Sequence, residues 1–471
     1  MSLPTPEGKQ KEVLCLPEKG HYIVLGTAGS GKTTLAIHRA SYLAKLNTLG
    51  DQKVLLVTFN KSLVTYLNSI SDKTLQKVVV QNYHKFARGY LSYRDMIGWN
   101  DIVDTDLKLS IIKEAMAEVI LEIGKNSTLS RAPEVFNEEI NWIEKMGITV
   151  LQDYIGAERI GRAGTRITRD RREYFFRVYE RYLEIRAQKG FKYDWDDIAR
   201  FAKEEFRKDK TNRMYKHIII DEGQDLSPIM LQSLVLAIPE DGSLTFFGDV
   251  AQQIYGGRIS WRDAGINVTK DEIWKFDQNF RNSKEIAELA IAISKLPCFK
   301  SNVDLVTPKS PTASAPLPVL AEFDDATKET NWIINNAETI SKTQTVAILV
   351  RDRGAVNDIK LKLLRKGLKC QELNGEMSRW DSSPGISVGT YHSAKGLEFY
   401  AVILPYFNSE RLPDKEKILA LEDRDEAMSE EVKLVYVAVT RAKRTLILTY
   451  AGEPTELIPE DETLYHKTKI I

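Results

Sequence analysis

The chain has 471 residues, of which 43% are hydrophobic and 28% are charged. This length corresponds to roughly three domains of average size, and the composition is that of a globular protein with a large buried core. Lys and Arg together number 66, and Asp and Glu also number 66, so the formal net charge is zero. This balance excludes a uniformly basic, histone-like nucleic-acid binder but leaves room for a locally basic channel.

Three cysteines, Cys15, Cys298 and Cys370, lie far apart and have no spacing typical of a zinc site or a disulfide framework. The N-terminal residues lack the apolar segment of a signal peptide, and no stretch approaches 18 apolar residues. We therefore expect a soluble, cytoplasmic protein that does not bind membranes.

Short apolar segments of strand type alternate with helical patterns through most of the chain. The expected strands cover residues 21–26, 53–59, 217–222, 244–249, 345–351, 399–405 and 444–450. Helical periodicity is clear in residues 34–46 and 283–296. Continuous apolar strands that alternate with helices are typical of parallel sheets covered on both faces. The sequence therefore predicts an α/β fold.

One region interrupts this alternation. Residues 92–210 show almost only helical periodicity, for example over 106–123 and 171–188. We interpret this region as a helical insertion within the first α/β lobe. Residues 307–318 contain four prolines and no periodicity, so they are expected to form a loop.

Charge is unevenly distributed along the chain. Residues 159–192 contain eleven basic and four acidic residues, whereas residues 410–431 contain nine acidic and four basic residues. Charge runs are most often solvated surface. The basic run is also a candidate nucleic-acid face, and we expect the acidic run to be a solvated loop.

Residues 26–33 read GTAGSGKT, directly after an expected strand and before an expected helix. This matches the phosphate-binding loop G-x-x-x-x-G-K-[ST], whose backbone N–H groups wrap phosphates at a helix N-terminus. Lys32 would reach the β- and γ-phosphates, and the Thr33 hydroxyl would hold Mg²⁺. A glycine-rich turn without a ligand is the alternative, which the strand, the Lys and the Thr together disfavour. The predicted nucleotide-binding residues here are Gly26, Thr27, Ala28, Gly29, Ser30, Gly31, Lys32, Thr33 and Thr34.

A second segment, HIIIDEGQD at residues 217–225, supplies acidic residues at the end of an apolar strand. Asp221 would hold the metal, and Glu222 would activate a water molecule. Phosphoryl transfer to water requires both of these roles. An acidic pair after a strand can also cap a helix, but a P-loop in the same chain favours the catalytic interpretation. We therefore predict ATP and Mg²⁺ as cofactors.

Further motifs follow in an order that resembles superfamily 1 helicases of the UvrD/Rep type. They are VTFNK (57–61), NYHKF (82–86), GDVAQQIY (248–255), QNFRNS (278–283), GTYHSAKGLEF (389–399) and EEVKLVYVAVTRAK (430–443). The resemblance implies two RecA-like P-loop NTPase lobes with parallel sheets and ATP between them. The first lobe would comprise residues 1–91 and 211–277, the helical insertion residues 92–210, and the second lobe residues 278–471.

The resemblance also implies roles for single residues. Three residues would contact the nucleoside: Gln10 and Phe280 at the adenine and Glu398 at the ribose. Three would act on the γ-phosphate: Gln252, Arg281 and the arginine finger Arg441. Contacts to a single strand would come from Phe59, His84, Trp261, Thr390 and His392.

Some of these residues have simpler interpretations. Gln10 taken alone is an ordinary surface residue, and His84 and His392 are equally well explained as hydrogen-bonding loop residues. Trp261 resembles a tryptophan that stacks on a base, which tolerates any sequence. However, residues 256–259 are an addition to the usual spacing, so packing in the core is the alternative for Trp261.

Three departures from the family pattern are visible. Thr34 stands where many relatives have an arginine over the adenine, which puts strict adenine selectivity in doubt. Gly223 replaces an aromatic residue of the acidic motif. Only about 35 residues separate the strand 345–351 from the motif at 389–399, so the large 2B insertion of full-size relatives is expected to be absent.

The sequence therefore predicts an ATP-dependent 3′–5′ translocase or helicase on single-stranded DNA, with a role in DNA repair or antiviral defence. The alternative is an ATP-gated, nucleic-acid-binding regulatory subunit of a nuclease or anti-phage complex, with a protein partner and weak unwinding of its own. A P-loop kinase is disfavoured by the two arginines of the second lobe, Arg281 and Arg441.

Overall fold

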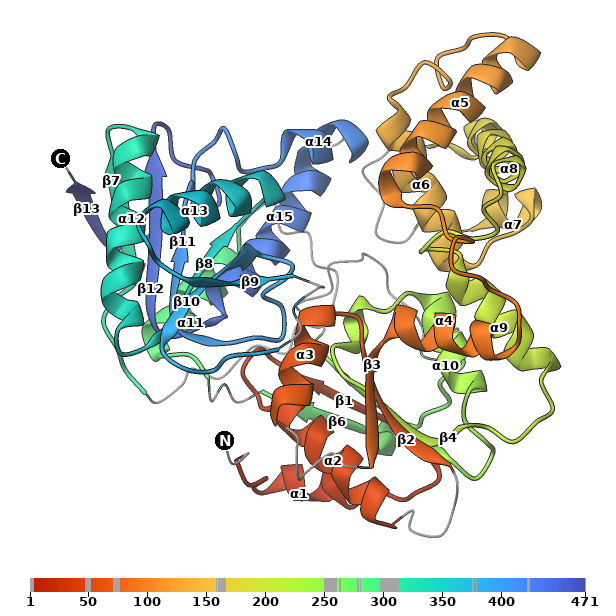
Figure 1. Cartoon of the computed structure of the whole chain (residues 1–471), viewed down its shortest axis with the longest axis horizontal. Helices are drawn as coiled ribbons and strands as arrows, with labels where there is room; N and C mark the ends of the chain where they lie inside the picture. Colours follow the sequence, from red (N-terminus) through yellow and green to blue (C-terminus); the bar gives the residue numbers. More distant parts are fainter. Residues whose placement is uncertain are drawn as a thin grey trace.

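The computed structural model describes most of the chain. The described residues are 4–46, 52–70, 77–157, 159, 167–249, 261, 264–277, 279, 281–296, 313–374, 377, 379–421 and 424–470. They form two α/β lobes and a separate helical body, which Figure 1 shows at the upper right.

The first lobe is built on a six-stranded sheet in the described residues, with the order β3-β2-β4-β5-β1-β6 and parallel pairing throughout. Its strands are β1 (Gly20–Gly26), β2 (Lys53–Thr58), β3 (Val78–Asn82), β4 (Tyr215–Ile220), β5 (Ser243–Gly248) and β6 (Ile273–Phe276). One face packs on α1 (Lys9–Leu14), α2 (Lys32–Leu46) and α3 (Lys61–Ile70). The other face packs on α4 (Tyr83–Tyr93), α9 (Ile198–Lys208) and α10 (Pro228–Leu236).

The second lobe has a seven-stranded parallel sheet in the described residues, ordered β13-β7-β12-β11-β8-β10-β9. Its strands are β7 (Val319–Phe323), β8 (Thr345–Val350), β9 (Cys370–Leu373), β10 (Gly385–Thr390), β11 (Phe399–Leu404), β12 (Ala442–Ala451) and β13 (His466–Ile470). Helices α11 (Lys284–Ile293) and α15 (Arg424–Val439) cover one face. Helices α12 (Ala326–Ser341) and α13 (Arg353–Arg365) cover the other.

The helical body has a core of its own. Its helices are α5 (Thr105–Ile123), α6 (Pro133–Met146), α7 (Leu151–Gly156) and α8 (Arg172–Gln188). The Asp104 side chain caps α5 by accepting from the Leu107 N–H at 2.8 Å, and α6 ends at Gly147, whose φ of 71° suits glycine. Helices α4 and α9, although inside the predicted helical region or at its start, pack on the first sheet.

The predicted α/β class with parallel sheets is confirmed, and each of the seven expected strands is a strand of the structure. Sequence reasoning missed the strands β3, β6, β7, β9, β10 and β13. β3, β6, β9 and β13 lie at sheet edges, and their side chains are mostly half-buried or exposed rather than continuously apolar. β7 and β10 lie inside the second sheet, but glycine or polar residues interrupt their apolar pattern. The continuous apolar pattern detects central parallel strands and passes over such edge strands.

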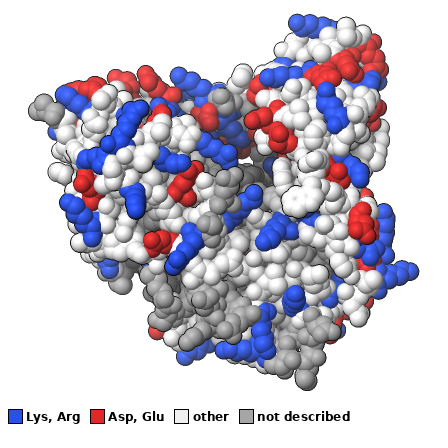
Figure 2. Space-filling model, viewed as in Figure 1, with Lys and Arg blue, Asp and Glu red and all other residues white. Residues whose placement is uncertain are grey.

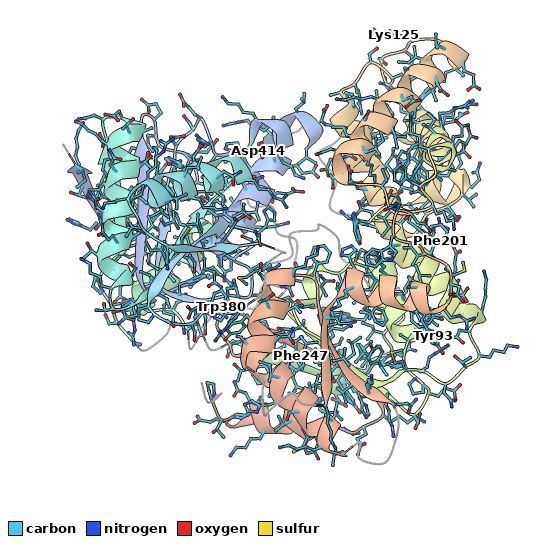
Figure 3. The ribbon with its side chains drawn as sticks, viewed as in Figure 1. Tyr93, Lys125, Phe201, Phe247, Trp380 and Asp414 are labelled. Atoms are coloured by element: carbon cyan, nitrogen blue, oxygen red, sulfur yellow. The ribbon has the colours of Figure 1, made fainter. Side chains whose placement is uncertain are left out.

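The interpretation of the acidic run as a solvated loop is wrong. Most of residues 410–431 lie in α14 (Lys415–Leu421) and the first half of α15. Helix α14 packs against α6 of the helical body, where Lys417 Nζ lies 3.5 Å from Glu138 Oε1 and 3.1 Å from Glu430 Oε2. Figure 3 labels Asp414 next to the start of α14, on the side of the second lobe that approaches the helical body. The charges of this run therefore connect two bodies.

The basic run is largely structural where it is described. Arg159 pairs with Glu139 at 2.6 Å, and the Arg172 guanidinium donates to backbone carbonyls at the end of α7. Arg177 and Arg181 pair with carboxylates on α5 and α8. Figure 2 accordingly shows basic and acidic side chains interspersed over the helical body. The described part of the run does not form a uniformly basic face.

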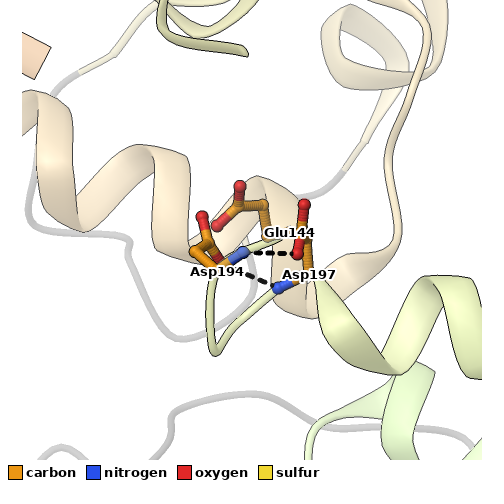
Figure 4. A group of neighbouring side chains, drawn as sticks. All are labelled: Glu144, Asp194 and Asp197. Atoms are coloured by element: carbon orange, nitrogen blue, oxygen red, sulfur yellow. Dashed lines mark hydrogen bonds between the residues drawn. The ribbon is translucent and has the colours of Figure 1, made fainter. Parts of the chain in front are cut away.

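A buried cluster of charges ties α5, α6 and α8 to the segment before α9. Glu144, Asp194 and Asp197 lie side by side in Figure 4, and their carboxylate oxygens are within 4.8 Å of one another. Lys108 Nζ lies 2.7 Å from Glu144 and 3.0 Å from Asp194, and Arg186 lies 2.8 Å from Asp197. Burial, reinforced by Asp194, raises the pKa of Asp197 to about 7. The two cations compensate charges that water cannot reach.

We predict that Lys108→Met destabilises the helical body by about 3–5 kcal/mol, because it leaves buried carboxylates without their cation. Chemical denaturation followed by circular dichroism measures this loss. Lys113→Met on the exposed side of α5 is the control and should stay within about 0.5 kcal/mol of wild type. Equal stability of the two variants would contradict the role of the cluster.

Candidate active site between the lobes

A cavity of about 1410 Å³ opens between the two lobes. The first lobe contributes the segment 4–10, the P-loop and Glu222 to its wall. The second lobe contributes Arg281, Glu398 and Arg441, which lie far from the P-loop in sequence. The cavity thus brings predicted residues from both halves of the chain to one place.

The P-loop connects β1 to the N-terminus of α2. Gly29 and Gly31 have φ angles of 77° and 82°, and a Cβ on Gly29 would overlap the Asn279 side chain. Glycine is required at such positions, because other residues rarely adopt positive φ. Lys32 is buried, and its ammonium donates to the carbonyls of Gly26 and Thr27 at 2.7 Å each. Ala28, Thr33 and Thr34 line the same cavity.

Asp221 and Glu222 follow β4, as predicted, and both are buried. Glu222 has a φ of 54°, an uncommon conformation for a residue other than glycine, which sets the direction of its side chain. Burial alone would raise the pKa of Glu222, but the charges of Lys395, Lys32 and Arg441 lower it below its ordinary value. Glu222 is therefore held as a carboxylate at the cavity wall.

Asp221 has the properties of a metal ligand. Burial, followed by the charge of Glu222, raises its pKa to about 7, while the nearby Thr33 hydroxyl and Lys32 ammonium act in the opposite direction. Neither carboxylate oxygen accepts a hydrogen bond from the described residues. A buried carboxylate with open lone pairs beside a P-loop hydroxyl fits a hard cation such as Mg²⁺, which prefers oxygen ligands.

Two polar residues that sequence reasoning missed connect the acidic motif to β5. Gln224 Nε2 donates to Glu222 Oε2 at 2.5 Å, and Gln224 Oε1 accepts from the Asp249 N–H at 2.9 Å. Asp249 also lies 3.8 Å from Lys32 Nζ. Both residues belong to motifs recognisable in the sequence, DEGQD and GDVAQQIY, and their place in those motifs was the available signal.

The residues of the second lobe are already paired with one another. Arg281 Nε donates to Glu398 Oε2 at 2.9 Å, and Lys443 lies 3.1 Å from Glu398 Oε1. The Arg441 guanidinium is 1% exposed and donates to the carbonyls of Val437 and Leu397. Burial lowers the pKa of Arg441 to about 10, and the Arg281 charge contributes in the same direction. Glu398 thus lies between the cations of Arg281 and Lys443.

Gln10 lies close to the P-loop, with its Nε2 3.4 Å from the Ser30 carbonyl oxygen. The buried Arg39 of α2 donates to the carbonyls of Leu14 and Pro17 at 2.9 and 2.8 Å. These bonds hold the C-terminal end of α1 and the residues that follow it against the first lobe. Gln252 and Phe280 lie outside the described residues.

Phe59 and His84, two of the five predicted strand contacts, lie together with Trp195. The His84 ring contacts Phe59 and Trp195 edge to face, with centroids 5.4 and 5.5 Å apart. His84 Nε2 also lies 3.1 Å from the Trp195 carbonyl oxygen. Sequence reasoning missed Trp195, although a tryptophan between acidic residues in the helical region was the visible signal. Aromatic groups of this kind can stack on bases of any sequence.

The other three predicted contacts are placed separately. The Trp261 ring meets Phe246 edge to face at 4.9 Å and is half-buried against the first lobe. A Cβ on Gly223 would overlap the Phe246 ring, so the space beside Gly223 is already filled. Thr390 and His392 lie at the end of β10, where the Asn60 side chain of the first lobe approaches the His392 carbonyl oxygen at 3.5 Å.

The fold and the cavity define a two-lobed P-loop nucleotide-binding protein. Residues 7–278 match the UvrD/REP helicase N-terminal domain, and residues 371–453 match the UvrD-like helicase C-terminal domain. The first match covers more than half of the chain, so the chain belongs to the UvrD/Rep helicase family. The family expected from the motifs is confirmed.

Several curated proteins are similar to the chain. A probable DNA helicase of Mycoplasma pneumoniae is 25% identical over 462 residues, which cover 92% of this chain and 80% of that protein. The mitochondrial ATP-dependent DNA helicase HMI1 of Saccharomyces cerevisiae is 30% identical over 210 residues, 41% of this chain and 29% of that protein. The helicase PcrA of Staphylococcus aureus is 35% identical over 93 residues, 18% of this chain and 12% of that protein. The chain thus spans most of the first protein and less than a third of each of the other two.

None of the helices in the described ranges combines the length and the apolar character that crossing a bilayer requires.

We predict that Glu222→Gln lowers ATP turnover by about 10²–10⁴-fold, the usual contribution of a general base, and leaves ATP binding intact. Lys32→Ala should instead weaken nucleotide binding by about tenfold or more, because a charge-assisted hydrogen bond is lost. Steady-state hydrolysis and titration with a fluorescent ATP analogue separate the two effects. Lys45→Ala, at the exposed end of α2, is the control. Wild-type turnover in either site variant would contradict the assignment.

Proposed function

We propose that the protein is an ATP-driven translocase and helicase that moves 3′ to 5′ on single-stranded DNA. The observation that carries this proposal is the shared cavity, whose walls hold the P-loop and Glu222 of one lobe opposite Arg281 and Arg441 of the other. A site divided between two lobes can convert nucleotide binding and hydrolysis into relative motion of the lobes. Membership of a helicase family supports DNA as the track.

In this proposal, Lys32 contacts the β- and γ-phosphates, and Thr33 and Asp221 would hold Mg²⁺. The metal, when bound, would neutralise phosphate charge during transfer. Glu222 orients and deprotonates the attacking water. The γ-phosphate is sensed by Gln252, Arg281 and Arg441, and the nucleoside is bound by Gln10, Phe280 and Glu398.

The strand would lie on the side of the lobes where Phe59 and His84 meet Trp195, with Trp261, Thr390 and His392 as further contacts. The aromatic cluster supports this placement, because Trp195 is 37% exposed and Phe59 and His84 are only partly buried, so that a base could reach the rings. Stacking of this kind contributes about 1–3 kcal/mol per base.

Parallel ATPase assays test the proposal, with no nucleic acid, single-stranded DNA, duplex DNA or single-stranded RNA added. Strong stimulation by single-stranded DNA is the expected result. A regulatory subunit that binds nucleic acid but depends on a nuclease or another protein partner would show little turnover under all four conditions. Stimulation by RNA alone would contradict DNA as the substrate and indicate an RNA translocase.

We predict that Arg441→Ala lowers stimulated turnover on the order of 10³-fold if Arg441 acts as an arginine finger. Its guanidinium now donates to backbone carbonyls of its own lobe, and it must turn toward bound nucleotide to act in this way. Arg365→Ala, on the exposed side of α13, should retain wild-type turnover. A loss below about tenfold in the Arg441 variant would make its role structural.

We further propose that the chain lacks a 2B insertion. In the described residues, the connection from β8 to β10 holds only α13 and β9. Melting a duplex costs about 1.4 kcal/mol of stacking per base-pair step, and the duplex ahead must be gripped while the motor advances. Four arginines of the basic run that could grip it, Arg159, Arg172, Arg177 and Arg181, are already paired with carboxylates or carbonyls.

The isolated chain should therefore translocate along single strands but unwind long duplexes poorly. Displacement of streptavidin from a biotinylated single strand measures translocation, and strand separation on a 3′-tailed duplex measures unwinding. Efficient unwinding of the long duplex by the purified protein alone would refute the prediction. It would show that the helical body is sufficient to hold the junction.

A further inference from the structure

A buried ion pair crosses the seam between the lobes, and the roles proposed above do not use it. Asp225 lies on the turn after β4 in the first lobe, and Lys395 lies in the loop after β10 in the second. Their side chains form a salt bridge, and both are at most 4% exposed. Burial raises the pKa of Asp225 to about 6, while the Lys395 charge opposes this shift.

On one side, the backbone around Lys395 is held by residues 59–65 of the first lobe, which begin with the proposed DNA contact Phe59. Asn60 Nδ2 donates to the Lys395 carbonyl oxygen at 2.8 Å. A Cβ on the next residue, Gly396, would lie 2.8 Å from Leu63 of α3, so the two lobes touch closely here. Two residues further along α3, Thr65 Oγ1 donates to the Met377 carbonyl oxygen at 3.0 Å. Movement of the segment 59–65 is therefore transmitted to the loop that carries Lys395.

On the other side, Asp225 closes the turn that carries the catalytic carboxylate. The Asp225 N–H donates to the Glu222 carbonyl oxygen at 3.0 Å. Among the charges around Glu222, that of Lys395 acts most strongly on its carboxylate. A chain of contacts thus runs from Asn60 through Lys395 and Asp225 to Glu222.

We propose that the Asp225–Lys395 pair couples binding of a single strand to the position of Glu222. Both members are positioning residues, which act through residues 59–65 on one side and the turn of Glu222 on the other. Separating the pair would leave two buried charges uncompensated, so the two segments move together. This inference rests on the proposed function.

The test compares the double variant Asp225→Asn/Lys395→Met with wild type. The double variant removes both charges and so avoids an unpaired buried charge that would impair folding. Two quantities are measured: the ratio of strand-stimulated to basal ATP turnover, and the change in affinity for fluorescent single-stranded DNA on adding a non-hydrolysable ATP analogue. Lys395→Arg retains the charge, and Lys360→Met removes a lysine that pairs with Glu372 within the second lobe.

In the double variant, both the stimulation ratio and the nucleotide-dependent change in strand affinity should fall on the order of tenfold, within the usual range of coupling between sites. Lys395→Arg should retain most of the coupling, and Lys360→Met should match wild type. A double variant with lower thermal stability but wild-type ratios would overturn the inference and make the pair purely structural. Wild type without any stimulation by single strands would instead refute the proposed function.

Discussion

Charges buried between the lobes are the constraint on which the rest of the site depends. Lys32, Glu222, Lys395 and Arg441 all lie in or beside the cavity with little access to water. Because an unpaired charge in such a place is costly, each one needs partners. Lys32 and Arg441 find hydrogen-bond acceptors within their own lobes, whereas Lys395 pairs with Asp225 across the seam. The lobes can therefore approach each other only where their charges match. The depressed pKa of Glu222 is one consequence, since Lys395, Lys32 and Arg441 together outweigh its burial.

The sequence was sufficient to predict the features that depend on local order. The P-loop, the acidic motif after β4 and the seven central strands each combine a short pattern with a fixed local geometry. Gly29 and Gly31 illustrate this, because their positive φ angles follow from the loop itself. The edge strands could not be predicted in this way, because their half-buried side chains lack a continuous apolar pattern. The pairings across the seam, such as Asp225 with Lys395, involve residues 170 positions apart and have no local signature.

Charge runs in the sequence also fail to predict which charges lie on the surface. In sequence, residues 159–192 are a basic stretch, but Arg159 and Arg186 are taken up by Glu139 and Asp197 in the interior of the helical body. Whether an arginine faces solvent or a buried carboxylate depends on the helix packed against it, which composition does not record. A run becomes a binding face only when tertiary partners leave its charges unpaired.

The helical body is fixed to the first lobe more firmly than to the second. Asp194 and Asp197, which belong to its buried charge cluster, directly precede α9 of the first lobe, and Trp195 between them reaches His84 on α4. In the described part of the chain, its strongest contact with the second lobe is the packing of α14 on α6, where the ion pair of Lys417 with Glu138 is partly exposed. Partly exposed pairs of this kind are weak. When the lobes move, the helical body should therefore move with the first lobe, and the contact between α14 and α6 is the one that yields. The aromatic cluster of Phe59, His84 and Trp195 then remains a rigid unit while the second lobe shifts past it.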